Sequence, residues 1–241
     1  MLNKVIKIHI SFDDVIFVFK DLERHKYKSI FQQRLLKRLK WFHDRYGCKF
    51  TLYVFIEYEG CSLGHLEDRY KEELLKNSDW LKLGYHGYSA EMPDDQFITG
   101  YNQFKKLIKG YEKIESHVIR LHRFQATFEE VAFLSQQGVK TLLTADDDRC
   151  NYDLSDVENR IVNTEGEYKK NNPLMHYEKT DLRLEDKDWK TKKRRTLKEK
   201  QHIVIFSHER FASVRFFSKE LFRMREIIRY LTKEYVVEFY N

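Results

Sequence analysis

Cysteine, proline and glycine are all scarce in this chain. Its 241 residues include three cysteines, two prolines and nine glycines. The cysteines, Cys48, Cys61 and Cys150, are odd in number and form no CxxC pair, so we expect reduced thiols and exclude a disulfide framework or a zinc knuckle. Because so little proline and glycine leaves little material for a flexible linker, we predict a single domain over residues 1–241.

Long hydrophobic runs are also missing. No run approaches the roughly 18 uncharged apolar residues that a membrane span needs. Residues 1–4 lead directly into an alternating strand pattern, without the apolar stretch and small-residue cleavage site of a signal peptide. We therefore expect no membrane span and a cytoplasmic location.

Basic residues exceed acidic ones, and the excess is concentrated in one stretch. The formal net charge is +6, and residues 187–200 hold eight Lys and Arg against Asp188 and Glu199. This stretch is either a solvated surface or a patch that attracts an anionic substrate, a polymer or a membrane surface. Nucleic acid is disfavoured as a partner, because the stretch lacks interleaved aromatic residues apart from Trp189.

Apolar residues, 41% of the chain, alternate between strand-like and helix-like patterns. The predicted strands cover residues 4–12, 49–56, 81–85, 118–121, 139–144, 202–206 and 235–239, and the predicted helices cover 28–46, 67–76, 94–111, 127–137 and 217–232. This rhythm predicts an α/β fold with a largely parallel sheet or barrel. Residues 151–200 break the rhythm, and we predict an insertion there with two or three short strands.

Chemically useful side chains follow the ends of several predicted strands. They are Asp13 and Asp14, Glu57 and Glu59, His86, His122 and Arg123, Asp146 to Asp148, and His208 and Glu209. A lone aspartate at such a place usually caps a helix or faces solvent. Because active sites gather at the carboxyl ends of parallel strands, their recurrence predicts one shared site at that rim.

Aspartate and histidine converging on one point form a mixed oxygen and nitrogen site that suits zinc or another divalent transition ion. A bound metal lowers the pKa of a water molecule and polarises a carbonyl oxygen. A carboxylate that does not bind the metal can take the proton of that water, and an imidazole can give one to the leaving group. These parts suffice for metal-assisted hydrolysis of an ester or amide.

Four motifs occur in order along the chain: Ser11-Phe12-Asp13-Asp14, Gly84-Tyr85-His86-Gly87-Tyr88-Ser89, Val118-Ile119-Arg120-Leu121-His122, and Phe206-Ser207-His208-Glu209. Together they resemble the motifs of the polysaccharide deacetylase family, including a divergent branch associated with bacterial surface-glycan genes. Their order and spacing span residues 8–210. The resemblance implies a deformed (β/α) barrel, with Asp13 as general base, Asp14 and His86 as metal ligands and His208 as general acid. It also implies that Arg120 orients the base.

The chain departs from the family pattern at one metal ligand. The family places a second histidine four residues after His86, where this chain has Ala90. Glu91 or His122 could supply the third ligand instead, and the third alternative is a site that binds metal weakly or not at all. We favour His122, because a strand end is positioned by the sheet, whereas holding a loop carboxylate costs ordering entropy.

The sequence thus predicts a divalent-metal hydrolase, zinc being the expected metal, that removes an N-acetyl or related acyl group from a sugar or glycan precursor. A cytoplasmic location favours a nucleotide-linked or lipid-linked precursor, whose phosphates the basic stretch 187–200 would attract. Asp146 and Asp147 are weaker candidates for substrate contacts. The alternative is a catalytically inactive protein of the same fold that binds glycan or acts in glycan assembly. Ala90 is the feature that supports it.

Overall fold

A computed structural model describes residues 4–90, 96–145, 152–213 and 218–241 of the chain. Five residues named above, Glu91, Asp146, Asp147, Asp148 and Cys150, lie outside the described residues. Cys48 and Cys61 are buried free thiols, as predicted. Within the described part, no helix is long and apolar enough to cross a membrane.

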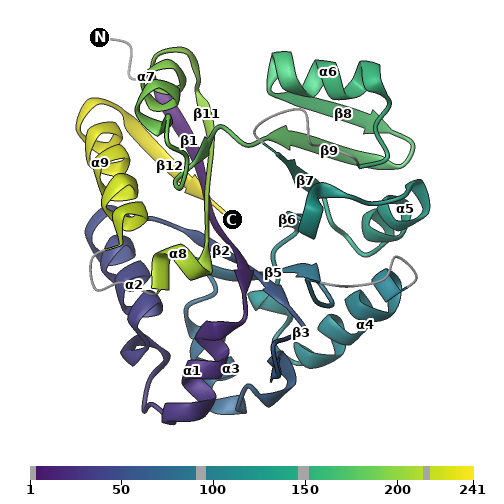
Figure 1. Cartoon of the computed structure of the whole chain (residues 1–241), viewed down its shortest axis with the longest axis vertical. Coiled ribbons are helices and arrows are strands. Elements are labelled where there is room, and N and C mark those ends of the chain that lie inside the picture. The colour runs from purple at the N-terminus through teal and green to yellow at the C-terminus, as the bar shows by residue number, and fades with distance from the viewer. Residues whose placement is uncertain (1–3, 91–95, 146–151, 214–217) are drawn as a thin grey trace.

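The larger sheet has six strands, all paired in parallel (Figure 1). Its order is β10-β11-β1-β2-β5, and β12 also pairs with β1. The strands are β1 (Val5–Val15), β2 (Phe50–Phe55), β5 (Leu81–Gly87), β10 (Leu182–Arg183), β11 (His202–His208) and β12 (Val236–Tyr240). Every residue of β2 is buried, which explains why its sequence is a continuous apolar and aromatic run rather than an alternating one.

The second sheet has the order β6-β7-β9-β8. Its strands are β6 (Val118–Ile119), β7 (Thr141–Thr144), β8 (Glu167–Asn171) and β9 (Leu174–Lys179). A parallel bridge between Leu83 and Glu115 joins the two sheets at one edge. At the other edge the chain passes from β9, paired with β7, almost directly into β10, paired with β11. The predicted parallel strands therefore divide between two connected sheets, an arrangement consistent with the predicted deformed barrel.

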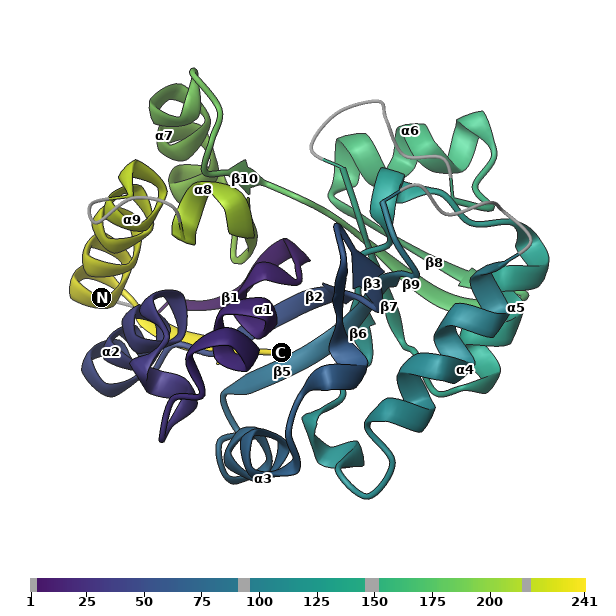
Figure 2. The same ribbon diagram turned by 60° about the horizontal axis from the view of Figure 1, so that its bottom comes forward.

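Nine helices of the described residues flank these sheets (Figure 2). They are α1 (Phe17–His25), α2 (Arg34–Tyr46), α3 (Asp68–Lys76), α4 (Phe97–Leu107), α5 (Phe128–Gln136), α6 (Asp156–Glu165), α7 (Trp189–Glu199), α8 (Glu209–Ser213) and α9 (Lys219–Glu234). Short connections include a hairpin of β3 (Glu57–Tyr58) and β4 (Cys61–Ser62) and 3₁₀ turns at Ile30–Gln32, Leu63–His65, Glu112–Ile114 and His122–Phe124.

Besides the short helices α1 and α8, which the sequence prediction missed, two parts of the chain differ from that prediction. The helix predicted over 28–46 is interrupted at Gln33, which is extended (φ −65°, ψ 135°) and whose side chain accepts a hydrogen bond from the Leu36 amide. Residues 151–200 contain the three short strands β8, β9 and β10, as predicted, but also α6 and α7. Because β9 and β10 join the two sheets, part of this stretch belongs to the framework rather than to an added loop.

Candidate metal centre

Two adjacent aspartates, Asp13 and Asp14, lie near the end of β1, and their carboxylates point to the same region. Successive residues of a regular strand point to opposite faces. Here the pairing of β1 with β2 shifts register between Phe12 and Val15, and Asp14 has a left-handed backbone with φ 57°. Such an irregularity re-aims side chains at functional sites, and aspartate tolerates this conformation better than most residues. Both Asp13 and Asp14 consequently contact side chains from the neighbouring strand ends.

Asp14, His86 and His122 bring their donor atoms together. Asp14 Oδ1 lies 3.2 Å from His86 Nε2 and 3.5 Å from His122 Nδ1. In the part of the chain that the structure describes, these residues form the one group of three or more with potential ligand atoms all within 4.8 Å of one another. They come from the ends of β1 and β5 and from the turn after β6. His122 therefore lies close enough to Asp14 and His86 to be the third ligand that the sequence favours.

The chemistry of this donor set fits a metal ion. His86 Nδ1 lies 2.6 Å from the carbonyl oxygen of Arg120, so it carries the proton of the neutral ring and leaves the lone pair on Nε2, the atom that faces Asp14. Zinc bonds of about 2.0–2.1 Å in tetrahedral geometry separate two donors by about 3.3 Å. The observed separations of 3.2 and 3.5 Å agree with that value.

Asp13 is held by a buried guanidinium. Arg120 Nη1 donates to Asp13 Oδ1 at 3.0 Å and to Ser11 Oγ at 2.9 Å, while its Nη2 donates to Thr180 Oγ1 at 2.8 Å. Arg120 is fully buried, and its guanidinium carbon lies 4.3 Å from the centre of the Phe206 ring. Such an ion pair compensates two buried charges and fixes the direction of the Asp13 carboxylate.

His208 faces the donor cluster from β11. Its Nε2 lies 3.9 Å from Asp14 Oδ2, and its Nδ1 lies 3.3 Å from Glu185 Oε1. The same Glu185 oxygen accepts hydrogen bonds from the His208 backbone amide at 2.6 Å and from Ser207 Oγ at 2.8 Å. Glu185 therefore favours a hydrogen on the Nδ1 atom of His208.

Sequence reasoning missed Glu185. It follows β10 in the stretch that was assigned to an insertion, and no motif includes it. The available signal was local: residues 182–185 alternate apolar and charged side chains, the pattern of a short strand that ends in a carboxylate.

The carboxylates shift the pKa values of this cluster. Burial opposes ionisation of Asp14, but hydrogen bonds from His122 and His86, together with the nearby imidazole charges, hold the pKa of its carboxyl well below the usual range. Burial likewise lowers the pKa of His86, but the carboxylates of Asp14 and Asp13 outweigh burial and raise it. Without a metal, the carboxylates of Asp14 and Asp13 give this cluster a negative charge, which favours the binding of a cation.

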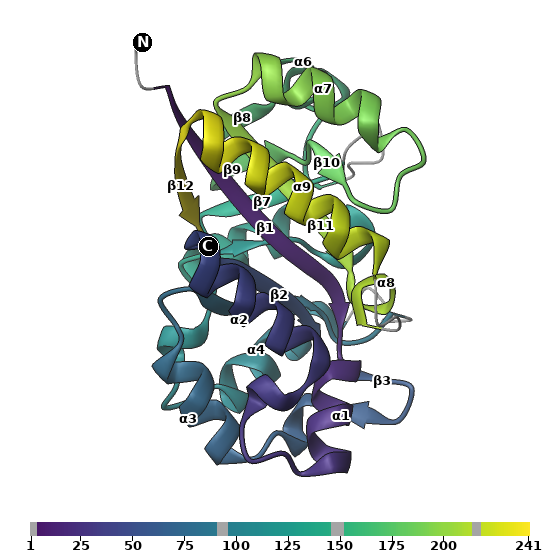
Figure 3. The same ribbon diagram turned by 90° about the vertical axis from the view of Figure 1, so that its left-hand side faces the viewer.

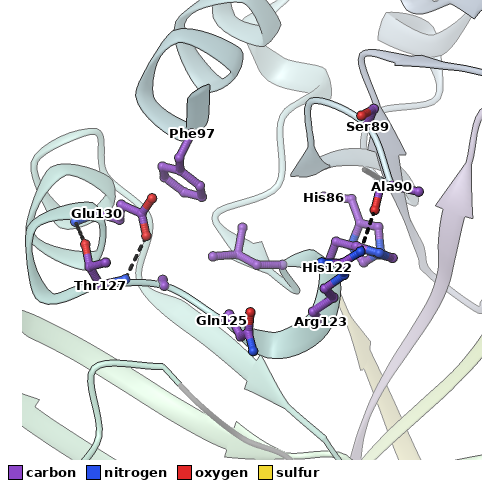
Figure 4. A pocket seen from close by; sticks show the side chains of 11 residues that line it. His86, Ser89, Ala90, Phe97, His122, Arg123, Gln125, Thr127 and Glu130 are labelled. Carbon is purple, nitrogen blue, oxygen red and sulfur yellow. Dashed lines mark hydrogen bonds between the residues drawn. The ribbon is translucent and has the colours of Figure 1, made fainter. Parts of the chain in front are cut away.

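A pocket of about 380 Å³ opens beside His86 and His122. Apolar lining comes from Phe97, Leu121 and Ala126, and polar lining from Ser89, Arg123, Gln125, Thr127 and Glu130. In Figure 4, His86, His122 and Arg123 lie on one side, and Thr127 and Glu130, at the start of α5, lie across from them. Arg123 Nη2 donates to the carbonyl of Ala90 at 3.2 Å, and Arg123 has a left-handed backbone with φ 59°. The pocket combines apolar walls with a few polar groups, as small-molecule sites do.

Among the strand-end residues that the structure describes, Glu209, Glu57 and Glu59 do not join this cluster. The Glu209 carboxylate accepts hydrogen bonds from the Ile16 and Phe17 amides at 2.7 and 2.9 Å, so it caps the amino end of α1. Glu57 lies in the hairpin β3–β4 and Glu59 in its turn, and both are exposed.

Comparison with known proteins assigns the fold. No family model matches this chain, and no curated protein matches its sequence. Among solved structures, a candidate polysaccharide deacetylase from Mycobacterium smegmatis aligns with a TM-score of 0.61 and 11% identity, covering 98% of this chain and 86% of that one. The Bc1960 peptidoglycan N-acetylglucosamine deacetylase aligns with a TM-score of 0.52 and 11% identity, covering 97% and 85%.

A different enzyme shares the fold. The 4-alpha-glucanotransferase from Thermococcus litoralis aligns with a TM-score of 0.60 and 10% identity, covering 98% of this chain and 39% of that one. The chain therefore has the α/β fold found in polysaccharide deacetylases, as its motifs indicate, while the fold by itself does not select the reaction.

Proposed function

We propose that this protein is a metal-dependent hydrolase that removes an N-acetyl or related acyl group from a sugar or glycan precursor. One observation carries the proposal: three donor atoms, from Asp14, His86 and His122, lie within 4.8 Å of one another beside a buried Asp13–Arg120 pair. A carboxylate and an imidazole that are not needed as ligands, Asp13 and His208, flank these donors. Zinc is the metal we expect there, because the donors are two imidazoles and one carboxylate.

In this proposal each side chain has one role. A metal held by Asp14, His86 and His122 would polarise the acyl carbonyl and acidify a water molecule. Asp13, oriented by Arg120, would accept a proton from the attacking water molecule as the new carbon–oxygen bond forms. His208 gives a proton from Nε2 to the departing nitrogen as the carbon–nitrogen bond breaks, while Glu185 keeps the proton on Nδ1. The products are a free amine on the sugar and a carboxylic acid.

The size and lining of the pocket beside the metal-binding cluster suit a substrate the size of a sugar. Its volume of about 380 Å³ falls within the range typical of small-molecule sites. Arg123, Gln125 and Glu130 offer hydrogen-bonding groups for hydroxyls, while Phe97 and Leu121 offer apolar surface. The cytoplasmic location, and with it a nucleotide-linked or lipid-linked precursor, stays a prediction from the sequence.

The test measures acyl release by the zinc-loaded protein. We expect acetate release from N-acetylglucosamine oligosaccharides or from a nucleotide-linked N-acetylhexosamine. The Asp13→Asn and His208→Ala variants should each lower kcat by about 10²–10⁴-fold while keeping their zinc, since neither residue is needed as a ligand. Asp44→Asn, an exposed substitution on α2, is the matched control and should leave kcat unchanged. Full activity in both site variants would contradict the assigned roles.

Ala90 supports a second candidate, a non-catalytic protein that binds glycan or acts in glycan assembly. Ala90 has no donor atom at the place where the related family puts a ligand. Elemental analysis separates the two candidates: the hydrolase should retain about one zinc per chain after zinc is supplied, as a three-ligand site does. Glycan binding, measured by calorimetry, by a protein that retains no zinc or cobalt would favour the non-catalytic protein.

A further inference from the structure

The helices α2, α7 and α9 carry the net positive charge of the chain, because the rest of the chain holds more acidic than basic residues. By sequence, α2 holds five Lys and Arg against one Asp, α7 six against one Glu, and α9 five against three Glu. The whole chain holds 44 basic and 38 acidic residues, a net charge of +6. The remainder of the molecule is therefore net acidic, and the basic excess is confined to these three helices.

These helices form one continuous surface, which we call the basic face. Figure 3 shows them side by side on one flank of the molecule, with α9 between the other two. The guanidinium of Arg225 on α9 lies 5.5 Å from the centre of the Trp41 ring on α2, and that of Arg223 lies 4.9 Å from the Trp189 ring on α7. Lys193 on α7 also pairs with Glu226 on α9. The charges thus belong to packed helices rather than to separate loops.

Exposed aromatic side chains lie among these charges. Phe222 and Tyr230 on α9 are 65% and 43% exposed, and Trp41 on α2 is 43% exposed. Phe222, Arg225, Arg229, Tyr230 and Lys233 follow one another at helical spacing along the outer stripe of α9. A buried helix stripe would be apolar throughout and a merely solvated one would be polar. Here aromatic rings lie among cations, and the one acid on the same surface, Glu226, is paired with Lys193 of α7.

We propose that the basic face binds the surface of an anionic lipid bilayer. Cations attract anionic headgroups, while aromatic rings at the same depth enter the region between headgroups and acyl chains. Duplex nucleic acid fits less well, because its major groove admits a single protruding helix and α9 is flanked by α2 and α7. This inference goes beyond the proposed acyl hydrolysis and does not depend on it, since no residue of the metal centre lies on these helices.

Vesicle sedimentation of the full chain tests the proposal. We expect the protein to pellet with vesicles of phosphatidylcholine and phosphatidylglycerol in a two-to-one ratio, and not with phosphatidylcholine alone. Binding should weaken strongly between about 0.1 M and about 0.5 M salt, because salt screens surface charge. The double variant Arg229→Glu/Lys233→Glu should lose about tenfold or more in affinity, since each cation near the surface contributes to binding.

Two further variants keep the test specific. Lys106→Glu/Lys140→Glu changes the same number of exposed lysine or arginine charges, but outside the three helices of the basic face, and should bind like the wild type. Phe222→Ser should weaken vesicle binding while leaving retention on heparin unchanged. Thermal melting verifies that each variant is folded. Equal binding to neutral and anionic vesicles, equal losses in the two charge-reversal variants, or binding to duplex DNA without binding to vesicles would overturn the proposal.

Discussion

His122 is the candidate third ligand of the metal centre, favoured from the sequence because Ala90 stands where the deacetylase family that the motifs resemble has a histidine. If it is the third ligand, His122→Ala should lower zinc affinity by orders of magnitude, because two protein ligands remain instead of three. Elemental analysis after gel filtration measures the bound zinc. The Glu91→Ala variant removes the other candidate for the third ligand, and it should leave the zinc content nearly unchanged. Stoichiometric zinc in His122→Ala would exclude His122 as a ligand.

Glu185 should act by positioning His208 rather than by touching substrate. Replacing its carboxylate in Glu185→Gln removes the negative charge that faces His208 Nδ1. We expect kcat to fall by about 10- to 100-fold, with KM and zinc content unchanged, because the substrate pocket and the ligands remain intact. Steady-state kinetics of acyl release provide the measurement, and Glu129→Gln, an exposed carboxylate on α5, is the control. A change confined to KM would argue against a positioning role.

His9 makes stability depend on pH. Burial lowers its pKa to about 3, with the Arg120 charge acting in the same direction. The unfolded chain binds a proton near pH 6.5 whereas the folded chain does not, so the stabilisation is complete above pH 6.5 and is lost as the pH falls toward 3. The loss is about 1.4 kcal/mol per pH unit in that window. The melting temperature of the wild type should therefore fall more between pH 7 and pH 5 than that of His9→Gln. Equal slopes would show that His9 is protonated in the folded state.

The sequence was most informative about residues at strand ends. Asp13, Asp14, His86, His122 and His208 converge in the structure because the parallel register of the strands brings their carboxyl ends to one rim. Residues 182–185 do show the local pattern of a short strand that ends in a carboxylate, but Glu185 was missed because its contact with His208 depends on the pairing of β10 with β11, which is distant in the sequence. The roles of all these residues remain predictions until activity and metal content are measured.

Among the secondary-structure elements, those with strong periodicity were predicted within a few residues. The strands β2 and β12 and the helices α3, α5 and α9 match their expected ranges closely. The helix α1 was missed, although Phe17–His25 has apolar residues at helical spacing, because it begins immediately after β1 and receives its cap from Glu209, far along the chain. The break at Gln33 depends on an extended backbone that the apolar pattern of 28–46 does not reveal.

Gly84 allows β5 to pack against a buried ring. A Cβ atom at this position would lie 2.6 Å from two carbons of the Tyr53 ring. That ring cannot shift easily, because the Tyr53 hydroxyl donates to the carbonyl of Val118 at 3.0 Å and lies 3.1 Å from His9 Nε2. Gly84→Ala should therefore lower the free energy of unfolding by about 1–3 kcal/mol. Chemical denaturation measures it, with Gly64→Ala as a control expected within about 0.5 kcal/mol of the wild type. An unchanged Gly84→Ala would mean that the core is loosely packed around Tyr53.

For the whole molecule, the β-α rhythm indicated the fold class, and the comparison with solved structures agrees with it at 10–11% identity. The rhythm could not reveal that the strands divide between two sheets, because that depends on the Leu83–Glu115 bridge and on the passage from β9 to β10. The sequence also revealed only part of the concentration of basic residues on one flank of the molecule. The stretch 187–200 is evident in the sequence, whereas its junction with α2 and α9 arises from packing.

The central claim is that Asp14, His86 and His122 together hold a metal ion. Its most direct test is a crystal structure of the zinc-soaked protein, with anomalous scattering measured at the zinc absorption edge. We expect one strong peak about 2.0–2.2 Å from Asp14 Oδ1 or Oδ2, His86 Nε2 and His122 Nδ1. A peak bound by Glu91 in place of His122, a peak elsewhere on the molecule, or no peak at this cluster would contradict the claim.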